Sequence, residues 1–434
     1  MSLRCFCAAM SALACLVGFG ATALAQTGDA DWNADMDSIV ATLEAEHPNP
    51  YWLTPKAEFD AAVAAWRRDL PGMNRAERIA GMARIVGLVG DGHTAFLLHD
   101  LSHGDNTMGP GFRLLPVRFE LFDDGLYIVG ATPAHAGLVG GRVESFGGLP
   151  PDEAVGRILV LMPRDAVGIA RELAPETLML AEIAAAVGLS DTPERIDLVV
   201  SRNGETVEVA LAPLPHGWNY EWMNHMDTGP WGPDGVADWV TASPDRPDFL
   251  DPSDQLRSLD TDVGGAAYLQ IWDIRAGEDG FDAAGRALAA AGEAFDRPRV
   301  IIDLRRCRGG DGSLNSGFVD ALANSAALNR PGGIIVLTSR QTHSAAIMLV
   351  SELEQRTSAI FVGQHTADRP NHYGETNFAM TPNLGFAWVH SSIYWQTSTP
   401  DDARRWRDPD IAIPYRFADY VAGRDPVLEA ALEY

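Results

Sequence analysis

The spacing of apolar residues predicts that the chain begins with helices. Apolar residues recur three and four positions apart over residues 32–43 and 57–70, the pattern of a helix with one buried face. A Pro-Asn-Pro tripeptide separates the two segments and breaks the pattern between them. A further helix is predicted over residues 80–90, ended by Gly90-Asp91-Gly92.

The middle of the chain alternates apolar and polar residues and is predicted to be rich in β-structure. Two short strands flank an Asp-Asp-Gly turn at residues 123–125, and two more flank Asn203-Gly204, a strong signal for a β-hairpin. The predicted strands are residues 117–121, 126–129, 196–201 and 206–211.

The C-terminal part alternates short apolar strands with helices and is predicted to be α/β. Such alternation implies a parallel sheet with crossover helices, and ligands of such sheets bind at the carboxyl ends of the strands. The predicted strands are residues 267–271, 300–304, 334–337 and 360–362, and the predicted helices are residues 281–295, 313–327 and 344–355.

These patterns divide the chain into five regions. Residues 1–25 have a weakly positive start, an apolar run and an Ala-Leu-Ala end, which is typical of a secretory signal peptide. Residues 214–262 are rich in Trp, Pro, Gly and Asp and are predicted to be a linker or a lid over a cleft. The predicted regions are a signal peptide (1–25), a helical domain (26–105), a β-rich domain (106–213), the linker or lid (214–262) and an α/β core (263–434).

Net charge, cysteine content and hydropathy limit the binding partners, the disulfide bonds and the location that we expect. The chain has 434 residues, with 33 Lys plus Arg against 59 Asp plus Glu and a net charge of −26, so we expect no nucleic-acid partner. Removal of the signal peptide leaves Cys307 alone, which excludes an intramolecular disulfide. No later stretch is long and apolar enough to span a bilayer, so we expect a periplasmic or secreted protein without stable membrane insertion. The sequence does not define an oligomeric state.

Two polar segments follow predicted strands of the α/β core. In Asp303-Leu304-Arg305-Arg306-Cys307-Arg308-Gly309-Gly310, paired glycines either turn the chain or expose N–H groups that stabilise an oxyanion. Ser344 follows the strand 334–337 at the start of a helix, and spacing alone favours a helix-capping serine over a nucleophile.

Two further segments carry candidate acid–base groups. His93 follows a glycine-containing turn, and Glu375 lies in the segment Pro370-Asn371-His372-Tyr373-Gly374-Glu375, where a solvated loop carboxylate is the alternative. No His-Glu-x-x-His motif and no clustered Cys/His pattern is present, so neither a catalytic metal nor a cofactor is expected.

Taken together, these segments resemble the C-terminal processing (tail-specific) serine peptidases. The family form Asp-Leu-Arg-x-x-x-Gly-Gly is matched by residues 303–310, Ser344-Ala345 is similar to the nucleophile segment, and residues 423–428 are similar to a tail of bacterial members. The resemblance covers nearly all of the chain after the signal peptide. It implies a crotonase-like (ClpP/crotonase) parallel-sheet core, with residues 106–213 as an inserted PDZ-like module and a helical domain before it.

The family uses either a Ser–Lys dyad or a tricorn-like Ser/His/Glu set. Lys56 is the single lysine of the chain, and arginine stays protonated and cannot serve as a base, which excludes the dyad. Residues 91–94 resemble the segment that carries the tricorn-like His, and residues 373–375 the segment that carries its Glu. A serine precedes that His in tricorn, whereas Gly92 stands there in this chain.

The resemblance implies a serine peptidase that acts on peptides or proteins through an acyl-enzyme. We expect Ser344 to be the nucleophile and His93 its base, with Glu375 orienting the polar site and the N–H groups of Gly310 and Ala345 holding the oxyanion. Three other histidines are rival bases: His343, His365 and His372.

Two departures from the family pattern leave other functions open. Ile347 replaces a common acidic residue three positions after the serine, and Gly363-Gln364-His365-Thr366 replaces Gly-Glu-x-Thr. The alternatives are a catalytically inactive ligand- or peptide-binding relative and an esterase-like acyl hydrolase. The PDZ-like module would either bind a peptide terminus by strand addition or only cover the cleft.

Overall fold

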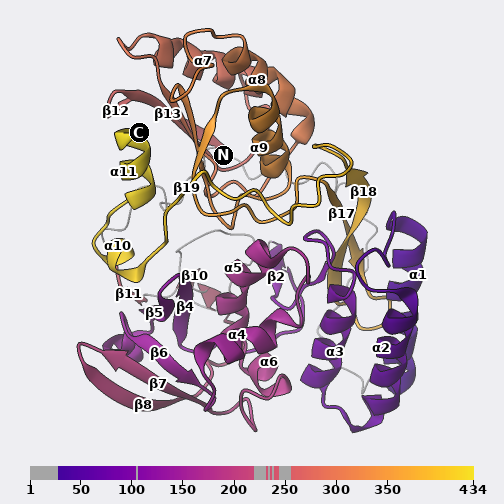
Figure 1. The fold of residues 1–434 in the computed structure, drawn as a ribbon. Helices are drawn as coiled ribbons and strands as arrows, with labels where there is room; N and C mark the ends of the chain where they lie inside the picture. Colours follow the sequence, from indigo (N-terminus) through magenta and orange to yellow (C-terminus); the bar gives the residue numbers. More distant parts are fainter. Residues whose placement is uncertain (1–27, 104–105, 219–230, 233–234, 237–238, 244–255) are drawn as a thin grey trace.

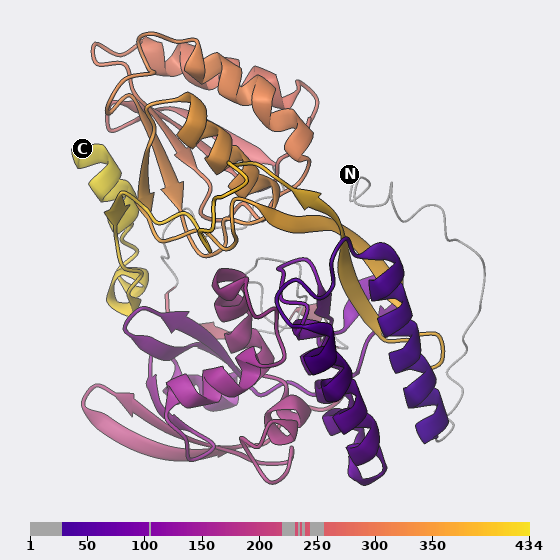
Figure 2. The ribbon, with the colours of Figure 1, turned by 45° about the vertical axis from the view of Figure 1, so that its right-hand side comes forward.

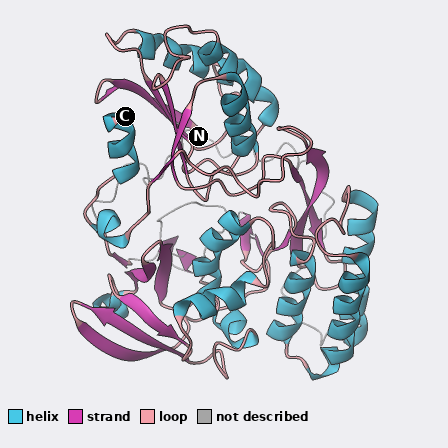
Figure 3. Cartoon of the chain, in the orientation of Figure 1, coloured by secondary structure: helices cyan, strands magenta, loops and turns pink. Residues whose placement is uncertain are grey.

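The computed structural model describes residues 28–103, 106–218, 231–232, 235–236, 239–243 and 256–434. Figure 1 shows an α/β part at the top, a β-rich part at the lower left and a helical part at the lower right, and Figure 3 shows how helices and strands are distributed among them. The predicted signal peptide lies outside the described residues. Among the helices of the described segments, none combines the length and the apolar character that crossing a membrane requires.

The predicted N-terminal helices are confirmed. A capping box begins the third helix, because the Asn74 side chain accepts from the Glu77 N–H (3.0 Å) while the Glu77 carboxylate accepts from the Asn74 N–H (2.7 Å). The apolar faces of these helices form one core with the β-rich part. The helices are α1 (Asp29–Glu46), α2 (Lys56–Asp69) and α3 (Arg75–Gly87).

The β-rich part contains the predicted strands and also helices that the strand-like pattern did not predict. In its sheet the strand order is β11-β5-β6-β7-β8, with β4 beside β5. The strands are β4 (Val117–Phe122), β5 (Gly125–Ala131), β6 (Arg142–Phe146), β7 (Ile196–Arg202), β8 (Glu205–Leu211) and β11 (Val240–Thr241), and the additional helices are α4 (Pro151–Leu159), α5 (Val167–Leu178) and α6 (Ala181–Ala186).

The α/β part is built on a six-stranded sheet with the order β12-β13-β14-β15-β16-β19. Its strands pair in parallel from β13 to β19, as the alternation of strands and helices predicted, and only β12 is antiparallel. The strands are β12 (Arg257–Val263), β13 (Ala266–Ile271), β14 (Val300–Asp303), β15 (Ile334–Thr338), β16 (Ile360–Gly363) and β19 (Ile411–Ala412).

Both faces of this sheet are covered, which explains its nearly continuous apolar strands. Ile302 and Val336 face the core formed with α7, α8 and α9, whereas Ile301 and Ile335 face the C-terminal helix α11. The helices of this part are α7 (Phe281–Glu293), α8 (Asn315–Ala323), α9 (Ala345–Arg356), α10 (Phe417–Val421) and α11 (Pro426–Glu433).

The sheet begins before the predicted core boundary. Residues 257–263 form β12, so part of the predicted linker or lid (214–262) belongs to the α/β part. Alternating acidic residues in this strand hid it from the apolar pattern, because an edge strand has an exposed face. Most of the remaining predicted linker lies outside the described residues.

A long hairpin joins the α/β part to the N-terminal helices (Figure 2). It consists of β17 (His372–Met380) and β18 (Ala387–Trp395), where the sequence suggested a loop around residues 370–375. The buried Asp35 of α1 accepts hydrogen bonds from the N–H groups of Asn383 (2.9 Å) and Leu384 (2.8 Å) at the hairpin tip. Strand β18 also pairs with β1 (Ala95–Phe96), directly after His93. The hairpin therefore brings the segment of His93 to the α/β part.

Candidate active site

The loop that carries Ser344 is fastened to the loop after β14. The Thr342 hydroxyl donates to the Leu304 carbonyl (2.9 Å), and the His343 N–H donates to the Cys307 carbonyl (3.1 Å). Both loops leave the carboxyl ends of adjacent parallel strands, where ligands of such sheets bind. This pairing places the start of α9 against Gly309-Gly310.

Ser344 does not act as a helix cap. It precedes α9 with φ 56° and ψ −126°, and its side chain makes no capping hydrogen bond. A positive φ is unfavourable for a residue with a Cβ, and such strained residues concentrate at functional sites. The capping interpretation, which spacing alone favoured, is therefore wrong. The backbone of Ser344 is strained, so contacts with the rest of the fold have to hold it in this conformation.

Gly309 makes room for Ser344. A methyl group on Gly309 would lie 2.6 Å from the Ser344 Cβ, 3.0 Å from its Oγ and 3.1 Å from the Ala345 backbone nitrogen. The first distance is shorter than real Cβ contacts and the other two are tighter than most of them, and the φ of Gly309 (124°) also favours glycine. The glycine thus allows the loop to approach the serine and the first N–H of α9.

The predicted oxyanion donors are the N–H groups of Gly310 and Ala345, which follow Gly309 and Ser344 in the chain. The Ile274 N–H donates to the Gly309 carbonyl (2.8 Å) and the Asp311 N–H donates to the Ile274 carbonyl (2.7 Å), a parallel bridge centred on Gly310. The bridge fixes the backbone of Gly310 directly after Gly309, the glycine that lies against Ser344 and the Ala345 backbone nitrogen.

His93 lies beside His343, the residue that precedes Ser344. Their rings stack with centroids 4.4 Å apart, and His372 stacks on His93 at 5.7 Å. His93 is only 6% exposed, and neither of its ring nitrogens has a hydrogen-bond partner among the described residues. Burial, reinforced by the neighbouring His343, lowers the pKa of His93 to about 3, so the ring is neutral near pH 7.

A buried carboxylate that the sequence analysis did not select completes this group. Asp368, 3% exposed, contacts the His343 ring through Oδ2 and Nδ1. Burial opposes the ionisation of Asp368, but the nearby His343 and His93 outweigh it and lower the pKa of Asp368. One ring nitrogen from each histidine and one Asp368 oxygen lie within 4.8 Å of one another, so these three side chains are also the described residues able to hold a metal ion.

The residue before His93 has to be small. A methyl group on Gly92 would lie 2.7 Å from the Asp368 Oδ1 and 3.0 Å from the His343 Cε1. The serine that the tricorn-like pattern places here therefore does not fit beside Asp368, which gives a physical reason for this departure.

Glu375 is not part of the histidine cluster. It lies exposed on β17 with φ 57°, and its backbone carbonyl accepts from the Ser392 hydroxyl (2.8 Å). None of the ion pairs among the described residues joins its carboxylate to a histidine. Asp368 follows β16 in the same segment, residues 363–375, and its place near a strand's carboxyl end was the signal that could have identified it.

A second buried carboxylate holds the His93 segment. Asp91 accepts from the backbone N–H of His93 (3.0 Å), the Ser391 hydroxyl (2.6 Å) and the His47 ring Nε2 (3.0 Å). The Asn49 N–H donates to the His47 Nδ1 (3.0 Å), so the Nε2 carries the proton given to Asp91. Burial alone would raise the pKa of Asp91, but these hydrogen bonds lower it. Asp91 thus ties His93 to α1 and β18.

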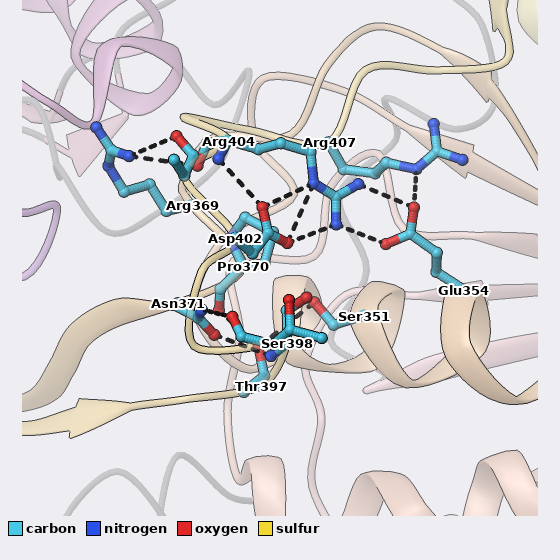
Figure 4. A network of polar contacts seen from close by, with 12 residues as sticks. Ser351, Glu354, Arg369, Pro370, Asn371, Thr397, Ser398, Asp402, Arg404 and Arg407 are labelled. Carbon is cyan, nitrogen blue, oxygen red and sulfur yellow. Dashed lines mark hydrogen bonds and ion pairs between the residues drawn. The ribbon is translucent and has the colours of Figure 1, made fainter.

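The residues that follow Asp368 are held by a polar network (Figure 4). The Asn371 side chain donates to the Thr399 carbonyl (2.7 Å) and accepts from the Ser398 N–H (2.9 Å). Arg369 pairs with Asp165, whose N–H donates to the Gly90 carbonyl (2.9 Å). The network thereby joins the Asp368 loop to the segment of His93.

Figure 4 also shows how the outer side of this network is anchored on α9. Arg404 donates to Glu354 (2.9 Å) and to Asp402 (2.7 Å), and Arg407 pairs with the same glutamate at 2.8 Å. The loop that carries Arg404 and Arg407 is therefore fixed to α9, the helix that follows Ser344.

Of the rival bases, His343 and His372 lie in the cluster and His365 does not. The His365 ring stacks on Trp406 at 4.6 Å, and its Nδ1 lies 2.8 Å from the Thr366 carbonyl oxygen. The structure thus brings together His93, His372 and Asp368 around His343, the residue that precedes Ser344, and it leaves Glu375 and His365 outside.

Solved structures with this arrangement of elements are known. A structure titled as mature CPAF complexed with lactacystin matches with a TM-score of 0.60 and 14% identity, over 93% of this chain and 98% of that chain. The chain shares its fold with CPAF. No family model matches the sequence, and no curated protein matches it. Because the identity to CPAF is low, the match establishes the fold and leaves the chemistry to the site.

Two further structures match with lower scores. The photosystem II D1 C-terminal processing protease has a TM-score of 0.38 and 11% identity, over 92% of this chain and 98% of that chain. Tricorn protease has a TM-score of 0.40 and 14% identity, over 93% of this chain and 36% of that chain. Scores this low support no argument of their own. The mixed α/β fold agrees with the prediction, whereas the crotonase-like core and the PDZ-like module stay predictions.

Proposed function

We propose that this protein is an exported serine peptidase that hydrolyses peptide bonds through an acyl-enzyme, with Ser344 as its nucleophile. The observation that carries the proposal is the backbone of Ser344, which has a positive φ, makes no capping bond and lies against Gly309. A structural serine at a helix start would relax to the ordinary capping geometry, because that geometry gains a hydrogen bond and loses strain.

His93 is the base that this arrangement favours. Its two ring nitrogens have no partner among the described residues, whereas the His343 Nδ1 already faces Asp368. The Ser344 hydroxyl has to reach His93 when substrate binds, and catalytic hydrogen bonds often tighten only at that stage. Asp368 takes the role expected for Glu375, because its negative charge stabilises a positively charged imidazole beside it.

The reaction follows from these positions. His93 accepts the Ser344 proton while Oγ attacks the substrate carbonyl carbon, and the N–H groups of Gly310 and Ala345 hold the oxygen that becomes negative. His93 then gives the proton to the leaving amine, which departs. A water, deprotonated by His93, attacks the acyl carbon, and His93 returns that proton to the Ser344 Oγ as the C–O bond breaks and the acid product leaves. Each oxyanion donor is typically worth about 10²–10³ in rate.

A fluorophosphonate probe tests the proposal, because it reacts with activated serines. We expect covalent labelling of the wild type at Ser344, located by peptide mass spectrometry, and none of Ser344→Ala. Ser316→Ala is the matched control, since Ser316 lies on α8 with its hydroxyl hydrogen-bonded to Glu352 (3.0 Å). A wild type that takes up no label at Ser344 would leave a ligand-binding protein as the better interpretation.

Two further assays separate a peptidase from an esterase-like hydrolase. Cleavage of a mixed peptide library, read by mass spectrometry, is expected for the wild type and not for Ser344→Ala. Lactacystin, the compound in the CPAF complex, can be tested as a second inhibitor, with Ser344→Ala for comparison. Labelling at Ser344 with cleavage of small esters but of no peptide would favour the acyl hydrolase.

A further inference from the structure

We propose that His93, His343 and Asp368 form a binding site for a divalent transition-metal ion such as Zn²⁺, and that the bound ion inhibits the enzyme. The three side chains come from the loop after α3, the residue before Ser344 and the loop after β16, which is why the sequence contains no metal motif. The binding site stands on its own geometry, and only the inhibition rests on the proposed function.

The donor atoms fit a transition-metal ion. One nitrogen from each histidine and one Asp368 oxygen lie within 4.8 Å of one another, whereas ligands of a tetrahedral zinc ion are about 3.3 Å apart because each zinc–ligand bond is about 2.0–2.1 Å long. The group therefore has to contract by about 1.5 Å at most, which side-chain rotations supply. Two imidazoles and one carboxylate favour Zn²⁺ over Mg²⁺ or Ca²⁺, which prefer oxygen ligands.

His93 gives an independent reason to expect a ligand here. Its side chain is more than nine-tenths buried, yet both ring nitrogens lack a hydrogen-bond partner among the described residues. A buried polar group without a partner destabilises the fold, so a ligand that binds one of these nitrogens removes the penalty. Three protein ligands also leave one coordination position open, the form typical of sites that exchange their fourth ligand.

Metal binding and catalysis compete for the same atoms. A nitrogen of His93 bound to zinc cannot accept the Ser344 proton, and a coordinated Asp368 no longer stabilises a positively charged imidazole. The ion would therefore hold the peptidase inactive until a chelating ligand or a low free zinc concentration releases it.

Isothermal titration with Zn²⁺ alone tests the site on Ser344→Ala, in a chain freed of any histidine tag. We expect one ion per chain, and affinity lowered at least about tenfold in His343→Ala and in Asp368→Asn made in the same background, since even residues that only support a ligand often cost 10–100-fold. His365→Ala is the matched control and should bind as Ser344→Ala does, because its ring stacks on Trp406 outside the cluster. Absence of binding, or equal binding in all variants, would overturn the site.

Thermal unfolding gives a second readout that does not depend on activity. Zn²⁺ should raise the melting temperature of Ser344→Ala and of its His365→Ala double variant, because an ion that binds only the folded state stabilises it. The same ion should leave the double variants with His343→Ala or Asp368→Asn unchanged. A rise of equal size in all four proteins would place the ion elsewhere and overturn the proposal.

Fluorophosphonate labelling of the wild type tests the inhibition separately. Zn²⁺ should slow the labelling of Ser344, EDTA should restore it, and Mg²⁺ should have no effect. Labelling that Zn²⁺ leaves unchanged, despite binding to Ser344→Ala, would overturn the inhibition. A wild type that is never labelled would refute the proposed peptidase function, while the titration still decides the metal site.

Discussion

The imidazole of His93 lies parallel to that of His343, with ring centroids 4.4 Å apart and 21° between the ring planes. His343 precedes Ser344 in the sequence. His93 comes from a distant segment and lies against His343 because the β17–β18 hairpin pairs with β1 and docks on α1. The stacked pair therefore joins the helical N-terminal part to the α/β part at the point where Ser344 begins its helix. Two histidines beside one serine make the identity of the base an experimental question.

Replacing each histidine separately should identify the base. His93→Ala is expected to lower the rate of fluorophosphonate labelling by about 10²–10⁴, the usual contribution of a general base. His343→Ala should lower it less, because His93 remains while one ring that packs against it is lost. Labelling reactions quenched at a series of times and read by mass spectrometry measure both rates, with His365→Ala as the histidine control. A wild-type rate in His93→Ala would remove His93 from the mechanism.

Replacing Asp368 and Glu375 separately should show which carboxylate supports catalysis. Asp368→Asn is expected to lower kcat by about 10²–10⁴ with KM nearly unchanged, because a carboxylate that orients and stabilises a catalytic imidazole acts mainly in the transition state. Glu375→Gln should retain wild-type kinetics, since its carboxylate is exposed on β17. Peptide hydrolysis measured over a range of substrate concentrations separates kcat from KM. The reverse order of the two effects would restore the role first expected for Glu375.

The sequence predicted the α/β strands well because their apolar runs are buried on both faces. Residues 300–304 and 334–337 became β14 and β15, and the polar ends of these strands became the candidate site. Gly310, Ala345 and Ser344 were selected from such positions, whereas His93 was selected because it follows a glycine-containing turn. Their convergence depends on contacts between segments far apart in the chain, which periodicity does not encode.

The features that the sequence did not predict also depend on contacts between segments far apart in the chain. Asp368 was overlooked because nothing local distinguishes a buried carboxylate from a solvated one, and its burial depends on Gly92 and His343 from other segments. Glu375 was favoured by its place in a motif, but it lies in a run of exposed residues of β17, 375–378. The helices α4 to α6 were not predicted, although α4 buries Ala154, Val155 and Ile158 at helical spacing, because the strand pattern before and after them was extended across residues 151–186.

Gly309→Ala should slow the labelling of Ser344 by about 10²-fold and leave the fold intact. Its new methyl group would lie 2.6 Å from the Ser344 Cβ, so either the serine or the glycine loop has to move, and a displacement of about 1 Å at a reacting group can cost about 10²-fold in rate. The positive φ adds about 1–2 kcal/mol of backbone strain.

Gly204→Ala separates the two effects of the Gly309 substitution. Gly204 also has a positive φ (82°), but a methyl group added to it at the β7–β8 turn would have no atom within 4 Å. This control should lose similar stability in thermal unfolding and keep the wild-type labelling rate. Equal labelling of Gly309→Ala and Gly204→Ala would show that Gly309 does not shape the site.

Arg305→Met should destabilise the chain by about 3–5 kcal/mol, because Arg305 is a buried cation between two carboxylates and its loss leaves buried charge unpaired. It is 3% exposed, and its guanidinium donates to Asp303 (2.6 Å) and to Asp425 (2.6 Å), which caps α11. Arg424→Met is the control, since its pairs with Asp419 and Glu429 are exposed and such pairs contribute about 0–1 kcal/mol. Denaturant unfolding compares the two variants.

The same ion pairs give stability a definite pH dependence. Burial alone would raise the pKa of Asp425, but the charge and hydrogen bonds of Arg305 lower it. A carboxyl whose folded pKa lies below its unfolded pKa, about 3.9, stabilises the fold above that pH and loses the contribution as the pH falls through the folded pKa. Asp425→Asn should therefore unfold more easily than wild type at pH 7, and the difference in melting temperature should shrink below about pH 4. A difference that stays constant from pH 7 to pH 3 would mean that Asp425 stabilises the chain as a helix cap and not through its charge.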